Sequence, residues 1–248
     1  MRIGVFDSGI GGINVLASLI KKYPHNEYIY FGDTKNLPYG DKDKETLLKM
    51  TRFNIDFLRS KGADEIVVAC GTVSSNTLDD VKDDYDFKIT GIIDALVNGA
   101  IKETKNNKIG IIATAATINT HIFKEKIKDK EVFEVACHKF TPLIEKGMID
   151  SEEMTEAIDE YLKPLKEKDI DTLIMGCTHY PLLEDKIRSY FSKPINIINS
   201  GTILAEELND GERKEPELEF YVSGDKEEFK EYSKRFIDID NIAELHNI

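Results

Sequence analysis

The run IGVFDSGIGG at residues 3–12 joins a short apolar segment to a glycine-rich turn. A brief apolar run that ends at turn residues is typical of a buried strand in a parallel sheet. The run IGIIATAATI at residues 109–118 resembles it, and Gly110 follows Gly4 by 106 positions (110 − 4). We therefore expect a strand, a turn and a helix to follow one another at both places.

A second pair of segments has almost the same offset. IVVACGT at residues 66–72 resembles LIMGCTH at residues 173–179, and Cys177 follows Cys70 by 107 positions (177 − 70). Similar strand–turn segments are common in α/β proteins, so one such pair alone would be weak evidence for an internal repeat. Two pairs with nearly one offset indicate an internal repeat of two similarly folded halves. If the halves face each other, the loops after their strands meet in a cleft, with Cys70 and Cys177 on opposite sides of one cavity.

The whole chain alternates short apolar runs with amphipathic stretches, which predicts an α/β fold with mainly parallel sheets. Apolar runs predict strands at residues 3–6, 28–31, 66–69, 89–93, 109–113, 173–175 and 195–198. Helical periodicity predicts helices at residues 44–61, 76–85, 155–166 and 183–191. We expect the polar residues 208–217 to form an exposed loop before a last strand and a terminal acidic helix.

Composition and charge exclude several classes of protein. The 248 residues are 41% hydrophobic and 32% charged, as in ordinary globular proteins. A net charge of −13 without a basic patch argues against a nucleic-acid partner. No apolar run approaches the length of a membrane span, and the N-terminus reaches a charged residue too soon for a signal peptide. We therefore expect a cytoplasmic protein with no membrane partner.

The three cysteines are too few for a disulfide framework and are expected to be reduced thiols. Cys137 has no counterpart in the repeat and is expected to be structural. No Cys-x-x-Cys or His-x₃-His spacing occurs, so a metal site is not expected. The glycine-rich turn fails the dinucleotide fingerprint, because Asn14 stands where the third glycine belongs. Its glycines are better explained by a substrate carboxylate or a tight turn.

Two opposed thiols suit the inversion of an α-carbon, in which one base removes a proton and an acid on the other face returns one. A cysteine can play either role, and each cysteine here precedes an expected helix, whose dipole favours the thiolate. No lysine sits in a context typical of pyridoxal phosphate, so no cofactor is expected. Backbone N–H groups and hydroxyls must then stabilise the developing carbanion. Ser8, Thr72 and Thr178 lie at suitable strand ends.

Four motifs in order give the chain a close resemblance to the glutamate racemase family, within the aspartate/glutamate racemase group. They are GVFDSGIGG at residues 4–12, YFGDT with LPYG at residues 30–40, Ala69-Cys70, and GCTHYPLL at residues 176–183. The resemblance implies two facing α/β domains with the active site in the cleft between them. One would comprise residues 1–95 plus 206–248 and carry Cys70, and the other residues 96–205 and carry Cys177.

The resemblance also implies a set of site residues. Cys70 and Cys177 would exchange protons with the substrate, assisted by Asp7, His179 and Glu145. The substrate pocket would comprise Asp7, Ser8, Pro38, Tyr39, Gly40, Gly71, Thr72, Thr114, Thr117, Thr178 and His179. The substrate would be a small acidic amino acid, and a homodimer is a candidate assembly.

Gly71 departs from the family, in which asparagine usually follows the first cysteine. An asparagine amide can hold a polar group of the substrate, whereas glycine offers only its backbone. An uncompensated loss would cost about 1–3 kcal/mol of binding. Ser74, Ser75 or Asn76 could replace the contact, or the substrate could differ.

Several functions are open at this point. The leading one is the conversion of L-glutamate to D-glutamate for peptidoglycan precursors. The alternatives are racemisation of aspartate or another small acidic amino acid, a decarboxylase that needs only one cysteine, and a non-catalytic amino-acid-binding module. Retention of both thiols and of His179 favours a racemase over a decayed binding module.

Overall fold

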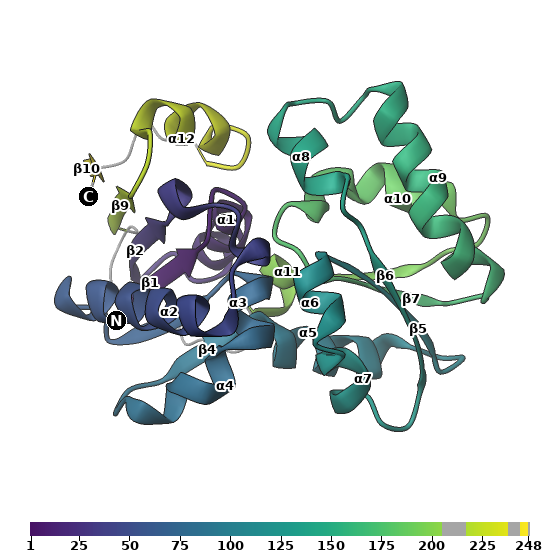
Figure 1. Cartoon of the computed structure of the whole chain (residues 1–248), viewed down its shortest axis with the longest axis horizontal. Coiled ribbons are helices and arrows are strands. Elements are labelled where there is room, and N and C mark those ends of the chain that lie inside the picture. The colour runs from purple at the N-terminus through teal and green to yellow at the C-terminus, as the bar shows by residue number, and fades with distance from the viewer. Residues whose placement is uncertain (205–216, 238–243, 248) are drawn as a thin grey trace.

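Two parallel β-sheets, one in each half of the molecule, form the frame of the fold (Figure 1). The structure is a computed structural model and describes residues 1–204, 217–237 and 244–247. The first sheet contains β1 (Arg2–Asp7), β2 (Glu27–Gly32), β3 (Glu65–Val68), β4 (Ile89–Gly91), β9 (Glu217–Val222) and β10 (Glu244–Asn247). The second contains β5 (Lys108–Ala113), β6 (Glu131–Ala136), β7 (Thr172–Met175) and β8 (Asn196–Asn199).

Helices connect the strands, as parallel pairing requires. They are α1 (Gly12–Lys22), α2 (Lys44–Ser60), α3 (Gly71–Asn76), α4 (Leu78–Val81), α5 (Ile92–Glu103), α6 (Ala115–Asn119), α7 (Ile122–Lys126), α8 (Phe140–Glu145), α9 (Glu152–Glu167), α10 (Glu184–Tyr190), α11 (Ser200–Leu204) and α12 (Lys226–Ser233). Short 3₁₀ turns cover Thr34–Asn36, Tyr39–Asp41, Lys82–Asp84 and Tyr180–Leu183. None of the helices described is long and apolar enough to cross a membrane.

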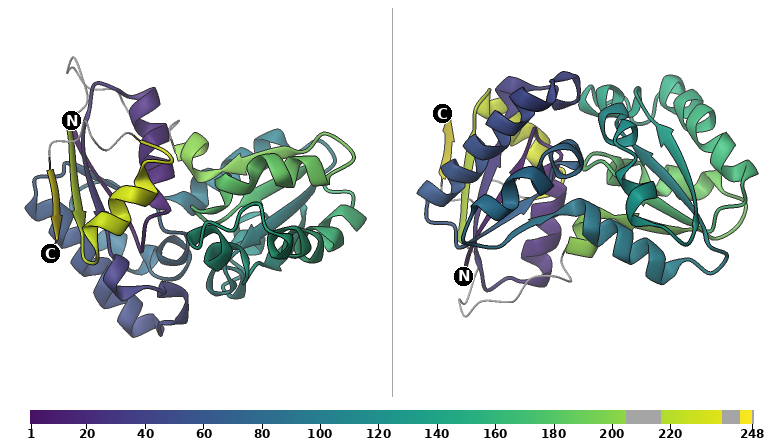
Figure 2. Two further views of the ribbon diagram at one scale, coloured as in Figure 1. Left: turned by 90° about the horizontal axis from the view of Figure 1, so that it is seen from above. Right: turned by 60° about the horizontal axis from the view of Figure 1, so that its bottom comes forward.

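The strand order confirms the internal repeat. The first sheet runs β10-β9-β2-β1-β3-β4 and the second β6-β5-β7-β8, so β2-β1-β3-β4 and β6-β5-β7-β8 are equivalent. The paired strands are parallel in both sheets. The repeat thus places Cys70 just after β3 and Cys177 just after β7, at equivalent edges. Near the C-terminus the chain returns to the first sheet, where β9 lies beside β2 (Figure 2).

Helix α2 shows how local chemistry sets an element's limits. Asp43 caps its start by accepting from the backbone N–H of Thr46 at 2.9 Å. Gly62, with φ +88°, follows its end, where only glycine is free of strain. Between them Leu47 and Leu58 are buried against the first sheet. Burial of each such side chain stabilises the fold by about 1.5–3 kcal/mol.

The structure corrects three expectations and adds one strand. The strand expected at 89–93 ends at Gly91, and α5 begins at Ile92. The helix expected at 76–85 begins at Gly71 and is interrupted at Thr77, whose hydroxyl bonds with the backbone of α3 and with Thr51. Strand β6 was not expected, because it is a half-exposed edge strand with charged residues. The expected strand and acidic helix after the loop are β9 and α12, but the helix is not terminal, since β10 follows it. Most of the expected loop, residues 208–216, lies outside the described residues.

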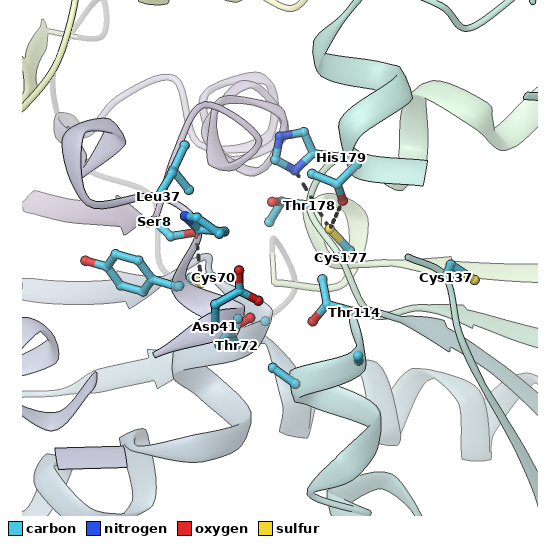
Figure 3. A pocket seen from close by; sticks show the side chains of 18 of the residues that line it. Ser8, Leu37, Asp41, Cys70, Thr72, Thr114, Cys137, Cys177, Thr178 and His179 are labelled. Atoms are coloured by element: carbon cyan, nitrogen blue, oxygen red, sulfur yellow. Dashed lines mark hydrogen bonds between the residues drawn. The ribbon is translucent and has the colours of Figure 1, made fainter. Parts of the chain in front are cut away.

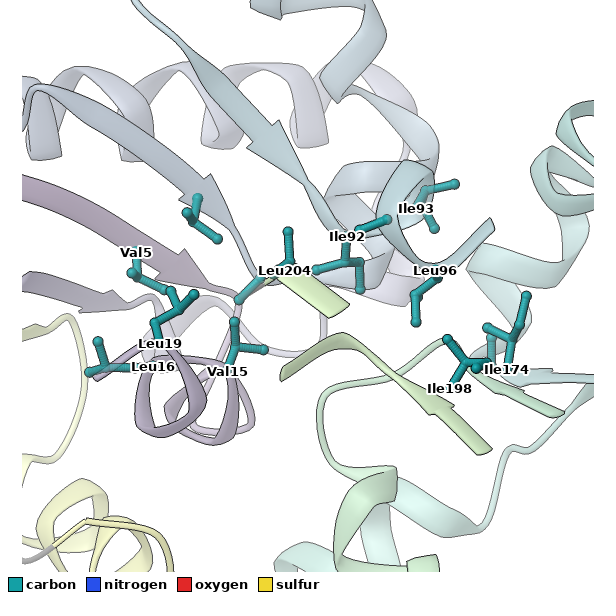
Figure 4. Close-up of a cluster of buried hydrophobic side chains, with 14 of the residues drawn as sticks. Val5, Val15, Leu16, Leu19, Ile92, Ile93, Leu96, Ile174, Ile198 and Leu204 are labelled. Carbon is teal, nitrogen blue, oxygen red and sulfur yellow. The ribbon is translucent and has the colours of Figure 1, made fainter. Parts of the chain in front are cut away.

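One buried apolar cluster runs from the first half to the second (Figure 4). Leu16 of α1 and Ile92 of α5 belong to it together with Ile174 of β7 and Ile198 of β8. Two further clusters cover the outer faces, one beneath α2 and one beneath α9. The shared cluster fixes how the two sheets sit, and therefore how the loops at their carboxyl edges face each other.

Candidate active site

A cavity of about 510 Å³ lies between the carboxyl edges of the two sheets (Figure 3). Both halves contribute to its lining, which comprises Asp7, Ser8, Leu37, Pro38, Tyr39, Gly40, Asp41, Cys70, Gly71, Thr72, Thr114, Ala115, Ala116, Cys137, His138, Thr141, Pro142, Glu145, Gly176, Cys177, Thr178 and His179. Cys70 and Cys177 lie on opposite sides of it. The internal repeat therefore brings the two equivalent thiols to one space.

Cys70 is buried on the side of the first sheet. Its Sγ donates to Oγ of Ser8 at 3.3 Å. Burial, and next the negative charge of Asp7, raise the pKa of Cys70 to about 12, although the hydrogen bond with Ser8 opposes them. Cys70 precedes α3, as expected, but burial and the neighbouring charge outweigh any helix-dipole effect. The resting group is a protonated thiol.

Cys177 faces a different set of partners. Its Sγ lies 3.8 Å from Nδ1 of His179 and 3.7 Å from Oγ1 of Thr141. Burial disfavours a charged imidazole, but Cys177, Glu145 and Asp7 together outweigh it and raise the pKa of His179 to about 10. Nε2 of His179 lies 3.3 Å from Oε1 of Glu145. An imidazolium beside Cys177 stabilises negative charge on that sulfur.

Asp7 explains the glycine-rich turn. Its carboxylate accepts from the backbone N–H groups of Gly9 at 3.0 Å and Gly12 at 3.2 Å. Burial raises the pKa of Asp7, while His179 and these N–H groups oppose the rise. The anion cradled by this turn is therefore an internal carboxylate, whereas we expected a substrate carboxylate or only a tight turn.

Two glycines allow the halves to touch beside the thiols. A Cβ atom on Gly71 would collide with the backbone carbonyl oxygen of Gly176. A Cβ atom on Gly11 would lie 2.6 Å from Nδ1 of His179. Real Cβ atoms do not come this close to other atoms. The two halves can therefore approach each other as closely as observed only with glycine at both positions. Gly71, whose role the sequence left open, is thus a contact point between the halves.

The other expected site residues fall into two groups. Ser8, Pro38, Gly40, Thr72, Thr114 and Thr178 line the cavity. Tyr39 also lines it, but its hydroxyl donates to Asp33 at 2.6 Å. Thr117 is fully buried and is absent from the lining; its hydroxyl accepts from Thr114 and so supports that residue.

Sequence reasoning missed several lining residues. His138 lies on the loop after β6, the strand that was not expected, and Thr141 lies on helix α8, which follows that loop. Cys137 lines the cavity too, although its sulfur points toward the carbonyl oxygen of Val135 at 3.7 Å. The repeat could have identified this segment, since β6 is the counterpart of β2.

The cavity has a largely apolar lining that carries a few polar groups and little basic charge. Its described lining contains no lysine or arginine, and His138 and His179 are its basic side chains. Within the described residues, no group of three or more His, Cys, Asp or Glu side chains could hold a metal ion. Polar contacts to an anionic ligand must then come mainly from hydroxyls and backbone N–H groups.

The charge on His179 makes a prediction about stability. A histidine whose pKa rises from 6.5 when unfolded to about 10 when folded adds stability that is complete below pH 6.5 and is lost as the pH rises through 10. We expect the free energy of unfolding of the wild type to fall between pH 6.5 and 9, measured by urea titration. His179→Gln should show a shallower fall; equal slopes would mean that the folded protein does not retain this proton. Cys70 acts in the same direction only above about pH 9.

The structure therefore belongs to a class with two facing parallel α/β sheets, each of which places one thiol in the cleft between them. The chain belongs to the Asp/Glu/hydantoin racemase family, whose family model matches residues 13–208. It is therefore an isomerase.

Similar proteins agree with this assignment. The chain is 40% identical to the glutamate racemase of Aquifex aeolicus over 227 residues, covering 90% of this chain and 89% of that protein. It is 41% identical to that of Thermoanaerobacter pseudethanolicus over 239 residues, covering 92% and 89%. The structure of glutamate racemase isoform RacE1 from Bacillus anthracis matches with a TM-score of 0.94 at 30% identity, covering 100% of this chain and 97% of that one. The enzyme of Francisella tularensis in complex with D-glutamate matches with a TM-score of 0.88 at 30% identity and the same coverage.

Proposed function

We propose that this protein interconverts L-glutamate and D-glutamate by moving protons through Cys70 and Cys177, with no cofactor. The observation that carries the proposal is the presence of both thiols, from equivalent strands, on opposite sides of one cavity. Relatives that are about 40% identical over some nine-tenths of the chain, and are named glutamate racemases, support the choice of substrate.

The two thiols would do complementary work. One thiolate removes the α-proton from its face of the substrate, and the opposite thiol donates a proton to the other face. After one turnover the first sulfur holds the proton taken from the substrate, and the second sulfur has given its proton to the product. The reverse reaction, or proton exchange with water, restores the initial state. The surroundings suit an initial state in which Cys70 holds its proton, while Nδ1 of the charged His179 faces the sulfur of Cys177.

The remaining lining residues would bind the substrate. Ser8 and Thr72 from the first half, and Thr114 and Thr178 from the second, line the cavity and would offer hydroxyls or backbone N–H groups to the substrate. Such donors suit the carboxylates of an acidic amino acid and the negative charge that develops as the α-proton leaves. Glu145 and Asp7 would act through His179 and the glycine-rich turn.

The proposal also covers the domain boundaries, the oligomeric state and the cellular role of the enzyme. The domains would be residues 1–95 with 206–248, and residues 96–205; the boundary at 206 lies outside the described residues. The enzyme would be a cytoplasmic homodimer that supplies D-glutamate for peptidoglycan, and thus for cell-wall biogenesis and cell shape. Analytical ultracentrifugation would test the dimer.

Proton NMR in D₂O with no added cofactor tests the reaction. With L-glutamate, we expect the α-proton signal to disappear and a chiral assay to detect D-glutamate. The Cys70→Ala/Cys177→Ala double variant is the control and should do neither. Exchange with aspartate in place of glutamate would change the substrate assignment. Binding of glutamate with no exchange, in a folded and reduced sample, would favour a binding module.

A further inference from the structure

One wall of the cavity is tied to a distant part of the chain by buried hydrogen bonds. Residues 38–40 line the cavity but carry neither thiol. Tyr39 is almost fully buried, and its hydroxyl donates to Oδ2 of Asp33 at 2.6 Å. Burial, and next the negative charge of Asp33, raise the pKa of Tyr39, so the hydroxyl keeps the proton that it donates. The position of this wall therefore depends on what holds Asp33.

The buried carboxylate of Asp33 is hydrogen-bonded at both oxygens. Oδ1 accepts from Oγ of Ser223 at 2.6 Å and from Nδ2 of Asn36 at 2.8 Å. Oδ2 accepts from Tyr39, and Nδ2 of Asn36 also reaches it at 3.0 Å. A buried carboxylate is tolerated only when such donors replace its lost water. These donors are all neutral side chains, so each of them matters for where the carboxylate lies.

Ser223 comes directly after β9, in the part of the chain that returns to the first sheet. Besides donating to Asp33, its hydroxyl accepts from the backbone N–H of Lys35 at 3.0 Å. Its own backbone N–H donates to the carbonyl oxygen of Gly32 at 3.1 Å. The next residue, Gly224, fits so closely that a Cβ atom there would lie 2.5 Å from Oγ1 of Thr34. Ser223 thus clamps the segment that carries Asp33.

Two further bonds fix the geometry of this network. Nδ2 of Asn54, on α2, donates to Oη of Tyr39 at 3.0 Å. That bond occupies the accepting side of the hydroxyl and leaves its proton for Asp33. The backbone N–H of Asp33 donates to the carbonyl oxygen of Asp7 at 3.1 Å, which anchors the network at the edge of the first sheet. Tyr39 is therefore held from α2 on one side and, through Asp33, from Ser223 on the other.

We propose that Ser223 is a positioning residue for the substrate-binding wall at residues 38–40, and that it acts through Asp33 and Tyr39. Ser223 is not among the described residues that line the cavity, so its influence on the substrate would be indirect. The returning part of the chain would thereby set the shape of a wall that it does not form. The effect on substrate binding rests on the proposed racemase function, whereas the hydrogen-bonded tie itself does not.

Ser223→Ala tests the proposal, because it removes one hydroxyl and adds nothing. We expect KM for glutamate to rise about tenfold while kcat stays within about threefold, because the displaced wall contributes to binding and not to proton transfer. Ser189→Ala is the matched control. It removes a serine hydroxyl that donates to the carbonyl oxygen of Asp185 on the surface at 2.7 Å, and it should leave both constants unchanged. An unchanged KM in Ser223→Ala, or a loss that falls wholly on kcat, would overturn the proposal.

The double variant Tyr39→Phe/Ser223→Ala shows whether Ser223 acts through Tyr39. Tyr39→Phe keeps the ring but cuts the bond to Asp33. If Ser223 acts through that bond, the double variant should raise KM no further than Tyr39→Phe alone. Additive rises in KM would mean that Ser223 acts by another route and would overturn the proposal. Unfolding curves of each variant check that the fold is retained.

Carbon-13 NMR of protein labelled at Cζ of tyrosine gives a readout that needs no turnover. The Tyr39 signal is assigned by its absence in Tyr39→Phe. We expect Ser223→Ala to change its chemical shift, because the Asp33 carboxylate that accepts from Tyr39 loses a donor, and Ser189→Ala to leave it as in the wild type. An unchanged shift in Ser223→Ala would overturn the proposal. A changed shift in a protein that does not racemise glutamate would refute the proposed function and leave the tie standing.

Discussion

Replacement of Cys70 or Cys177 by alanine is expected to lower kcat for racemisation at least about 10³-fold, because each variant lacks the acid or base for one face of the substrate. The two variants should differ in isotope exchange. Each retains one thiol, so each should exchange the α-proton of only one glutamate enantiomer in D₂O, and the two variants should act on opposite enantiomers. Chiral chromatography with mass detection of deuterium measures both quantities.

Cys137→Ala is the natural control for these variants. Cys137 is a third buried cysteine beside the same cavity, but its sulfur is directed at the backbone of Val135. We expect it to keep kcat within about threefold of the wild type, as for a small buried side chain with no chemical role. Loss of activity equal to that of Cys177→Ala would remove the distinction between catalytic and structural thiols.

A side chain at Gly71 is expected to lower kcat/KM about 10²-fold in Gly71→Ala. Its Cβ would collide with the carbonyl oxygen of Gly176, so helix α3 and the loop after β7 must move apart. That movement separates Cys70 from Cys177, and a displacement of about 1 Å between reacting groups can cost this much. Gly40→Ala is the comparison, because a Cβ there meets only Ala116 at an ordinary 3.6 Å. It should lose far less activity than Gly71→Ala.

Gly71→Asn distinguishes two explanations of this glycine. If glycine sets the separation of the halves, asparagine should be at least as harmful as alanine. If glycine is instead a lost substrate contact, asparagine should restore it and lower KM for glutamate. Steady-state kinetics on the three Gly71 proteins, with unfolding curves to check the fold, decide between them.

The sequence was sufficient to predict those parts of the fold and site that its repeat encodes. The apolar runs around Val5, Val67, Ile111 and Ile174 each form a buried strand, because an unbroken short apolar run suits a sheet covered on both faces. The equivalent positions of Cys70 and Cys177 in the two halves were predicted from the nearly constant spacing between the paired segments. Strand β6 escaped prediction because two glutamates interrupt its apolar residues, so it lacks the continuous apolar run by which the other strands were recognised.

Other features depend on contacts between distant residues, which a periodic pattern does not encode. The sequence does not reveal that Gly9 and Gly12 bond to Asp7, that Gly71 touches Gly176, or that burial leaves Cys70 protonated. Ser223 is a clear case. It lies 190 positions after Asp33 (223 − 33), outside every recognised motif, and only the folded chain brings the two side chains together.

The apolar cluster shared by the two sheets bears on how such a protein could arise. A half cut out alone would expose its share of the cluster, including Ile174 and Ile198, to water. An ancestral half of this kind would therefore need a second copy to cover it, and the present chain is equivalent to such a pair fused by duplication. Fusion lets the two copies of one thiol site diverge, since each now has its own codons. Asp7 beside one sulfur and His179 beside the other are the kind of difference that such freedom allows.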